Sequence, residues 1–564
     1  MIKKIQILRS KFKKYNIDGY IVPKNDDYFT EYSKINRLKI ISNFSGSAGL
    51  AIILKKKNYL FTDGRYTIQS QIESGKNFKI LSFEKLNNCN LFKNLKLGID
   101  PKLFTYQQIK KFFLKNNKIE YINKNLIDEI QKQKVDDSFP FFSLKKNIVG
   151  ESTNSKLDKI SKYLKKEKSD YLFISAPENV AWILNIRGRD GPNSPIPNSR
   201  LIISKTKKIL LISKFKKCKK LFRKKVIKSN EFIDTKEFPK KILDLKGKRF
   251  IIDRNSCSIF YENIIKSKFK IIKGEDPTYL LKAIKNKTEI KNMVNAHILD
   301  GAALTKFLYW IKNVNKKTID EVQAQNKLES FRKLNKNYLY PSFDTIAGSG
   351  KNGAIVHYRA NKENCKKIQK KDIFLCDSGG QYKYGTTDVT RTICFSKPKP
   401  YIRDIFTKVL KGHIAVANTN LKKDNNGKKI DIRARKFLKK SNLDYAHGTG
   451  HGVGFFLNVH EGPQSISKIN KIKIREGMIL SNEPGYYLKN KFGIRIENLV
   501  YVKKTKKNIF FENLTMAPIE KDLINFKILT SPEKKYLFKY HLDVYSKISK
   551  FLNFKEKQWL ASFI

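Results

Sequence analysis

Residues 377–388 (DSGGQYKYGTTD) constrain the fold more than any other part of this 564-residue chain. The apolar run at 373–376 predicts a strand leading into Asp377, the two glycines predict a turn, and residues 382–387 predict a second strand. Asp377 and Asp388 would then lie on neighbouring strands with their side chains on one face. Two such carboxylates repel each other unless a proton or a cation lies between them, and oxygen ligands suit divalent metals. Taken alone, however, the stretch is more typical of a polar surface hairpin.

Three later segments supply further ligand types. His447 and His451 lie in a glycine-rich run, HGTGHGVG, where no bulky neighbour blocks the imidazoles. Glu483 and Glu497 each lie at or beside a strand-like segment. With the aspartates, His451 and the two glutamates make five candidate ligands, enough for two metals if carboxylates bridge. Structural zinc sites prefer Cys and His, so this oxygen-rich set favours manganese or cobalt.

These segments resemble the pita-bread metallopeptidases of family M24, which include methionine aminopeptidase, prolidase and aminopeptidase P. The order Asp, Asp, His, Glu, Glu matches, as do the spacings of 388 − 377 = 11 and 497 − 483 = 14 residues. The chain is most similar to cytosolic, three-domain Xaa-Pro aminopeptidases. That likeness rests on NGAIVHY (352–358), GTTDVTRT (385–392) and HGTGHGVGFFLNVHEGP (447–463), and it extends over nearly the whole chain.

The resemblance implies an α/β protein with an α+β catalytic domain. Two creatinase-like N-terminal α/β domains are expected at residues 1–147 and 148–285, the second with a strand order loosely parallel to that of the first. The pita-bread catalytic domain is expected at 286–507, with a C-terminal extension packed on it at 508–564. The length alone predicts two to four domains.

The resemblance also implies an aminopeptidase that removes the first residue from peptides with proline at the second position. The nucleophile would be a water bridged by two divalent metals, Mn²⁺ before Co²⁺ or Zn²⁺. Asp377 would bind one metal, His451 and Glu483 the other, and Asp388 and Glu497 both.

Further roles follow from the same likeness. Glu483 would shuttle the proton, and His447 would lie near the developing oxyanion or the leaving nitrogen. His357 and His460 would line the pocket for the proline, with His357 also serving catalysis. Arg495 lies two residues before the last glutamate, so on a regular strand it would share its face, orient a carboxylate and contact the substrate.

Two alternatives remain. One is a prolidase that cleaves only Xaa-Pro dipeptides, and the other is a silent pita-bread scaffold that binds protein or nucleic acid. All five candidate ligands are present, which argues against a silent scaffold. The three-domain length and the HGTGHGVG run favour the aminopeptidase over the prolidase.

The formal charge of +65 permits attraction to nucleic acid or other anions. The lysines are spread along the chain and no nucleic-acid motif accompanies them, which favours a compositional bias. We expect peptide substrates, no nucleic-acid partner and, by resemblance, a homodimer. No run of about 18 apolar residues and no clear signal peptide is found, so we expect no membrane span and a cytoplasmic location. A basic entrance would favour acidic peptides.

Local patterns give four further expectations. Residues 107–133 have helix-like patterning, and residues 192–199 read as an exposed loop. Thr288 is expected to cap a helix that continues through Trp310, and the Ser-Pro-Glu at 531–533 is expected to begin another.

Overall fold

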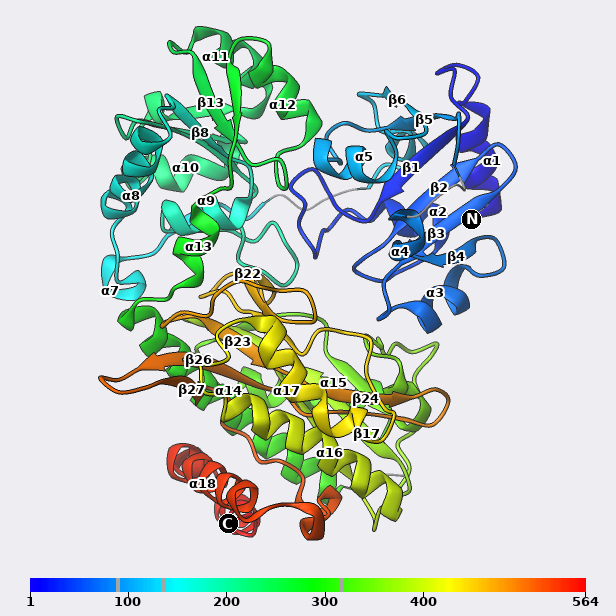
Figure 1. The fold of residues 1–564 in the computed structure, drawn as a ribbon, viewed down its shortest axis with the longest axis vertical. Coiled ribbons are helices and arrows are strands. Elements are labelled where there is room, and N and C mark those ends of the chain that lie inside the picture. Colours follow the sequence, from blue (N-terminus) through cyan, green and yellow to red (C-terminus); the bar gives the residue numbers. More distant parts are fainter. Residues whose placement is uncertain (88–91, 134–137, 315–318) are drawn as a thin grey trace. The chain divides into compact units, whose positions relative to one another are not determined.

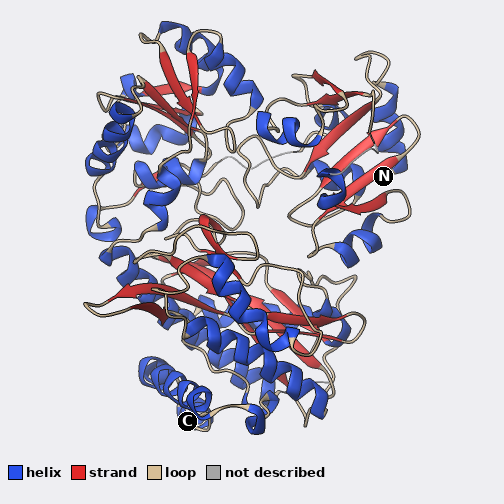
Figure 2. Cartoon of the chain, viewed as in Figure 1, coloured by secondary structure: helices blue, strands red, loops and turns tan. Residues whose placement is uncertain are grey.

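The computed structural model describes residues 1–87, 92–133, 138–314 and 319–564. The chain divides into two compact units, Met1–Tyr279 and Leu280–Ile564 (Figure 1). Helices and strands are mixed throughout both units (Figure 2). In the described residues, no helix is both long and apolar enough to cross a membrane.

The first unit contains two six-stranded sheets with the same topology. Their strand orders are β4-β3-β2-β1-β5-β6 and β12-β11-β10-β8-β13-β14. In each sheet the first strand pairs antiparallel with the second and parallel with the fifth, and the third and fourth strands run parallel. The strands are β1 Gly19–Pro23, β2 Leu50–Leu54, β3 Asn58–Thr62, β4 Lys79–Ser82, β5 Lys96–Ile99, β6 Lys118–Tyr121, β8 Tyr171–Ile174, β10 Arg200–Ser204, β11 Ile209–Ser213, β12 Phe232–Asp234, β13 Arg249–Ile252 and β14 Lys270–Lys273.

Helices and one short strand pair connect these strands. Apolar side chains of the central strands are buried against the helices, which gives each sheet its own core. The connecting elements are α1 Ile2–Ser10, α2 Arg37–Ser42, α3 Thr67–Ser74, α4 Phe83–Asn87, α5 Tyr106–Phe112, α6 Leu126–Ile130, α7 Lys146–Val149, α8 Thr153–Lys166, α9 Pro177–Ile183, α10 Phe215–Arg223, α11 Phe238–Asp244, α12 Ile259–Lys266 and the pair β7 Phe142–Ser143 and β9 Ile186–Arg187.

The helix expected at 107–133 is wrong, because strand β6 interrupts it. Thr105 caps α5 in a capping box with Gln108, and Asn125 caps α6 separately. Between these helices, residues 118–121 pair with β5 in parallel register. Pairing with an existing sheet edge therefore overrides the local helical pattern.

The loop at 192–199 is not exposed as expected, since residues 193–197 are buried. The Gly188 and Asp190 amides donate to the carbonyls of residues 195 and 196. The Asp190 carboxylate accepts from the Asn198 amide and forms a buried ion pair with Lys217 at 2.6 Å. These bonds satisfy the polar backbone that would otherwise need water.

The second unit is built from antiparallel sheets covered by long helices (Figure 1). One sheet has the order β16-β17-β20 and another β22-β21-β23-β26-β27. Smaller sheets are β15-β18-β19 and β24-β25. The strands are β15 Tyr338–Pro341, β16 Ile346–Ser349, β17 Ile373–Ser378, β18 Gly380–Tyr382, β19 Gly385–Thr386, β20 Val389–Cys394, β21 Gly450–Gly452, β22 Glu461–Ile466, β23 Ile479–Asn482, β24 Gly485–Leu488, β25 Phe492–Arg495, β26 Asn498–Lys504 and β27 Ile509–Asn513.

The helices of this unit are α14 Lys287–Asn313, α15 Glu321–Lys333, α16 Pro400–Ala417, α17 Gly427–Lys439, α18 Ser531–Ile548 and α19 Phe554–Ala561, preceded by α13 Thr278–Ala283. Side chains of α14 pack against β17 and β20, and those of α16 and α18 share a core with residues of β25. Asn286 rather than Thr288 caps α14, because its side chain accepts from the Thr288 and Glu289 amides. Helix α18 begins at Ser531, which confirms the start expected there.

The second strand expected at 382–387 is replaced by two short strands. β18 and β19 pair with each other, and β17 pairs instead with β20, so that Asp377 lies opposite Thr390. A Cβ on Gly385 would lie 2.6 Å from Ala296 of α14, so the chain turns tightly against that helix. Asp388 precedes Thr390 by two residues and therefore shares a face with Asp377, as the sequence predicts.

Candidate metal centre

Strand ends of the second unit bring the five candidate ligands to one place. Asp377 lies in β17, Asp388 directly precedes β20, and His451 lies in β21. Glu483 follows β23, and Glu497 lies between β25 and β26. One ligand atom from each of Asp388, His451 and Glu497 lies within 4.8 Å of the other two. The His451 Nε2 atom is 3.4 Å from Asp388 Oδ2 and 3.5 Å from Glu483 Oε1.

The His451 ring is oriented as a metal ligand would be. Its Nδ1 lies 2.9 Å from the Gly452 carbonyl oxygen, so Nδ1 donates there and Nε2 faces the carboxylates. Burial favours the neutral imidazole, but Asp388 and Glu483 outweigh it and raise the pKa of His451 to about 9. A metal ion bound by Nε2 would therefore displace a proton.

Two carboxylate oxygens of the cluster have no hydrogen-bond donor among the described residues. They are Asp377 Oδ1 and Glu497 Oε1, and both are buried. Burial raises the pKa of both carboxyls, and the neighbouring Asp388 and Glu483 charges raise them further, although Arg495 opposes the shift. Buried acceptors without donors are costly, and a divalent cation satisfies such oxygens. The donor set therefore fits a metal centre.

Arg495 orients the carboxylates of Asp377 and Glu497. Its Nη2 donates to Asp377 Oδ2, and its Nε donates to the Thr390 hydroxyl at 3.0 Å. That hydroxyl in turn donates to Glu497 Oε2 at 2.7 Å. The arginine thus orients Asp377 directly and Glu497 through Thr390, and its use in contacting substrate stays a prediction.

His447 lies close to the cluster with a defined tautomer. Its Nδ1 is 2.7 Å from the Gly448 carbonyl oxygen, and its Nε2 is 2.9 Å from the Tyr487 hydroxyl. Arg495 Nη1 donates to the same hydroxyl at 2.7 Å, so the tyrosine donates onward to His447. Burial lowers the pKa of His447 to about 4, which keeps the imidazole neutral at physiological pH.

The other two candidate histidines, His357 and His460, lie in different places. The His460 ring packs edge-on against His451, with 4.2 Å between the ring centroids. His357 is half-buried in the loop after the 3₁₀ turn Gly350–Ala354. That turn packs against β25, because a Cβ on Gly353 would lie 3.3 Å from the Gly493 nitrogen.

Sequence reasoning missed three residues that contact the candidate ligands or His447. Thr390 and Tyr487 make the contacts described above, and the Ser481 hydroxyl donates to Glu483 Oε1 at 3.1 Å. Thr390 lies two residues after Asp388, and Ser481 lies two residues before Glu483. A residue two positions from a candidate ligand lies on the same face of a strand, so a hydroxyl residue at this spacing could have predicted these contacts.

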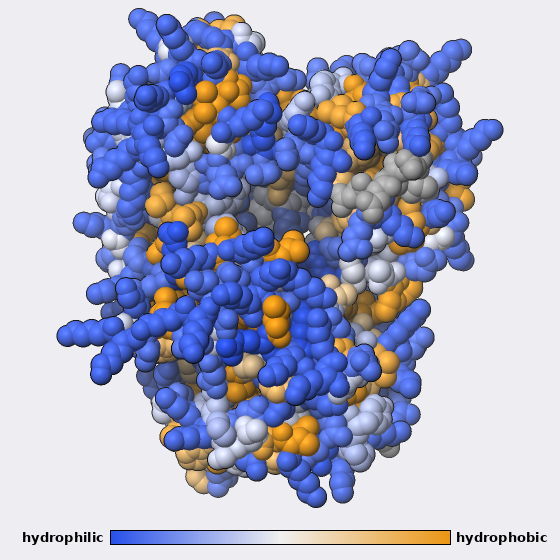
Figure 3. Space-filling view, in the orientation of Figure 1, coloured by the Kyte–Doolittle hydropathy of each residue, from blue (hydrophilic) through white to orange (hydrophobic). Residues whose placement is uncertain are grey.

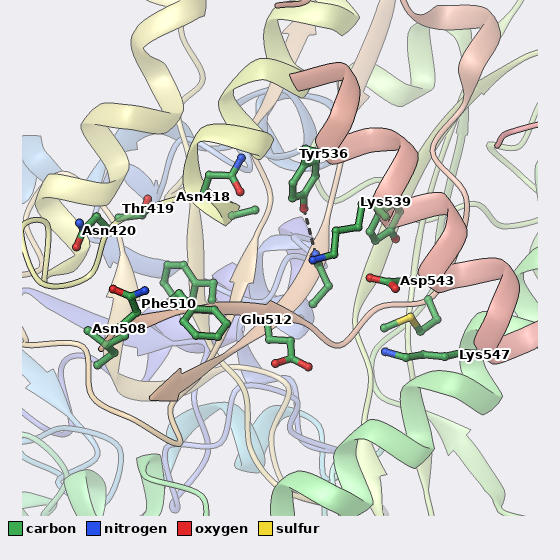
Figure 4. Close-up of a pocket in the computed structure, with 16 residues that line it drawn as sticks. Asn418, Thr419, Asn420, Asn508, Phe510, Glu512, Tyr536, Lys539, Asp543 and Lys547 are labelled. Atoms are coloured by element: carbon green, nitrogen blue, oxygen red, sulfur yellow. Dashed lines mark hydrogen bonds between the residues drawn. The ribbon is translucent and has the colours of Figure 1, made fainter. Parts of the chain in front are cut away.

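A separate pocket of about 810 Å³ lies between the end of α16, strand β27 and helix α18. Figure 4 shows its polar lining, in which the Asn513 amide donates to the Tyr536 hydroxyl. None of the five candidate ligands lines it. Acidic and basic side chains are both present in its wall.

Four sequence families together match most of the chain. Residues 4–125 and 132–289 match two families described as Creatinase/Prolidase N-terminal domain. Residues 291–504 match metallopeptidase family M24, and residues 508–562 match the C-terminal region of peptidase M24.

Full-length relatives decide the assignment. Xaa-Pro aminopeptidase 1 of Dictyostelium discoideum is 37% identical, covering 99% of this chain and 96% of the relative. The chain belongs to the Xaa-Pro aminopeptidase family. A probable Xaa-Pro aminopeptidase P of Laccaria bicolor is 36% identical over 98% of this chain and 91% of that protein. Membership in this family confirms the predicted peptidase class.

Solved structures agree with this family. X-prolyl aminopeptidase from Caenorhabditis elegans, described as a cytosolic enzyme with a dinuclear active site, matches with a TM-score of 0.92. It is 28% identical and covers 100% of this chain and 98% of its own. Prolidase from Pyrococcus horikoshii is 26% identical with a TM-score of 0.53, covering 65% of this chain and 99% of its own. The predicted fold class, two creatinase-like domains before an M24 domain, is confirmed.

Proposed function

We propose that this member of the Xaa-Pro aminopeptidase family removes the first residue from peptides that carry proline at the second position. The observation that carries the proposal is the convergence of Asp388, His451 and Glu497 on one point, with Glu483 and Asp377 beside it. Relatives that bear the Xaa-Pro aminopeptidase name over their full length support the same activity.

The cluster would hold two divalent metals. The oxygen-rich donor set and the dinuclear site named for the C. elegans enzyme support two ions, and we propose Mn²⁺ before Co²⁺ or Zn²⁺. Asp377 would bind one ion, His451 and Glu483 the other, and Asp388 and Glu497 both. When bound, such ions supply Lewis acidity and lower the pKa of water.

The protein side chains would handle protons and orientation. Burial opposes ionisation of Glu483, but charged His451 and Arg495 lower the pKa of Glu483 and keep it ionised, so this carboxylate would be able to accept a proton and pass it to the leaving amine. Neutral His447, held by Tyr487, would face the developing oxyanion or the leaving nitrogen. His447 would also contact the substrate.

Selection of proline would come from the pocket walls. The nitrogen of the scissile bond is that of the proline and carries no N–H, so recognition by a hydrogen bond from this nitrogen fails there. His357 and His460 would line the pocket for the ring, with His357 also assisting catalysis. Arg495 would orient Asp377 and contact the substrate.

The proposal also covers the domain boundaries, the oligomeric state and the location of the protein. We place domain boundaries at 1–147, 148–285, 286–507 and 508–564, the last segment packed on the catalytic domain. A homodimer and a cytoplasmic location follow the family likeness, and the C. elegans enzyme is described as cytosolic. The face in Figure 3 is mostly hydrophilic, with hydrophobic side chains scattered over it. Peptide substrates and no nucleic-acid partner belong to the same proposal.

A prolidase is the second candidate. The P. horikoshii prolidase is similar to only 65% of this chain, so the remaining third has no counterpart in it. A silent scaffold is a poorer fit, because such a protein would have no need of five converging ligand residues.

The test compares two substrates. Protein stripped with chelator and supplied with Mn²⁺ should release the first residue from an Xaa-Pro-Yaa tripeptide, and Glu483→Ala should abolish this release. Cleavage of the Xaa-Pro dipeptide alone would establish the prolidase instead. Metal binding without cleavage of either peptide would leave the silent binding scaffold as the remaining candidate.

A further inference from the structure

A buried ion pair on α17 lies behind the loop that carries His447. Asp431 and Arg435 are one helical turn apart, and both are almost fully buried. Arg435 Nε donates to Asp431 Oδ2 at 2.8 Å. Neither residue belongs to the metal centre, and the mechanism above does not use them.

The Arg435 side chain holds the loop at 444–447 by hydrogen bonds to the backbone carbonyls of the loop. Its Nη1 donates to the Tyr445 carbonyl at 2.7 Å, and its Nη2 donates to the His447 carbonyl at 2.6 Å. Nη1 also reaches the half-exposed Asp444 at 2.6 Å, and the guanidinium stacks 3.9 Å from the centroid of the Tyr445 ring. A planar fork that makes all these contacts leaves the loop little freedom.

Asp431 holds the chain just after this loop, at Thr449. Its Oδ1 accepts from the Thr449 hydroxyl at 2.6 Å, which in turn accepts from the Tyr445 hydroxyl. The carbonyl of Thr449 accepts from the Glu483 amide at 2.8 Å. A chain of hydrogen bonds therefore connects one helical ion pair to both His447 and Glu483.

We propose that Asp431 and Arg435 are positioning residues for the reaction, which set the distance between His447 and Glu483 without touching the substrate. The His447 Nδ1 atom lies 4.0 Å from Glu483 Oε2. These two side chains lie on different segments, and Thr449, which Asp431 of α17 holds by its hydroxyl, joins the segments by accepting from the Glu483 amide. The inference rests on the proposed aminopeptidase activity, and it extends that proposal to two residues outside the centre.

The direct test replaces Arg435 and measures kcat, KM and bound metal separately. With an Xaa-Pro-Yaa tripeptide, Arg435→Met should lower kcat about 10- to 100-fold, because small displacements of catalytic groups have this effect. The fall in kcat should exceed any change in KM or in metal content, because Arg435 itself contacts neither the substrate nor a metal ion. Arg435→Lys keeps the charge without the fork and should give an intermediate kcat.

Arg433 provides the matched control. It lies on the same helix, is partly exposed and pairs with Asp424 rather than with the loop. Arg433→Met should leave kcat unchanged. Should Arg435→Met not fold, Thr449→Val answers the question, because it keeps the ion pair and removes only the hydroxyl contacts.

Amide hydrogen exchange supplies a readout that does not depend on activity. Arg435→Met and Thr449→Val should speed exchange at 444–449 and at Glu483, while Arg433→Met should not. Unchanged exchange and an unchanged kcat in the Arg435 and Thr449 variants would overturn the inference, as would a loss of kcat that only follows a loss of folded protein. If the protein without any substitution cleaves neither the Xaa-Pro-Yaa tripeptide nor the Xaa-Pro dipeptide, the proposed function is refuted. Hydrogen exchange would still test whether Asp431 and Arg435 hold the His447 and Glu483 segments in place.

Discussion

Replacing Thr390 with valine should weaken metal binding without removing a ligand. Valine has nearly the same shape, but it can neither donate to Glu497 Oε2 nor accept from Arg495 Nε. The Glu497 carboxylate, whose other oxygen has no donor among the described residues, would then lose the hydroxyl that fixes its orientation. The expected effect is a less ordered Glu497 carboxylate.

General values for such contacts give the expected size of this effect. Loss of a hydrogen-bonded partner behind a ligand typically lowers metal affinity about 10- to 100-fold, or about 1.4 to 2.8 kcal/mol. Part of the lost hydrogen-bond energy, about 1.5–3 kcal/mol for a bond to a charged group, should appear as reduced stability rather than reduced affinity. Both quantities therefore have to be measured.

Thr392 is the matched control for this experiment. It lies two residues further along β20 and is equally buried, and its hydroxyl exchanges two hydrogen bonds with the Arg495 backbone. Thr392→Val should also reduce stability, but it touches no ligand carboxylate. Calorimetric titration of metal-free protein with Mn²⁺ should show weaker binding only for Thr390→Val. Equal affinities for that variant and the unchanged protein, or equal weakening in both variants, would refute the reasoning.

Three further predictions concern stability and substrate charge. Burial lowers the pKa of His541 to about 4, against ~6.5 in the unfolded chain, so its contribution to stability should fall by up to about 3 kcal/mol as the pH drops from 6.5 to 4. In thermal scans at each pH, His541→Gln should make the loss of stability smaller by that amount, and His447 should keep part of the dependence. Glu461→Met should reduce the free energy of unfolding by about 3–5 kcal/mol and lower the melting temperature, because it removes the carboxylate that buried Lys282 and Lys285 share. Glu329→Met removes a surface ion pair with Lys333 and should change the melting temperature little. Acidic tripeptides should be cleaved with higher kcat/KM than basic ones at low salt, and equal rates would count against a basic entrance.

The five candidate ligands could be singled out because their signal is local, and their role as metal ligands stays a prediction. Asp377 and Asp388 follow and precede strand-like runs, and His451 lies among glycines, so residue type and order sufficed. The order also matched a known family, which supplied the roles that residue chemistry leaves open. The shared face of the two aspartates was predicted correctly although the partner strand was not.

The supporting contacts could not be predicted because they depend on register between distant strands. Arg495 pairs with Asp377, 118 residues away, rather than with Glu497, two residues further along the chain. Its link to Glu497 passes through Thr390, which only the pairing of β17 with β20 places there. In the same way, β6 forms because β5 offers it an edge, which residues 107–133 alone do not reveal.

The measurement that tests the central claim most directly is the metal content of the protein. After chelation and reconstitution with Mn²⁺, elemental analysis should find two ions for each folded chain. Glu497→Ala should retain fewer than two, because that carboxylate is assigned to both ions. Two ions retained in Glu497→Ala, or none in the unchanged protein, would contradict the assignment of these five residues to a dinuclear centre.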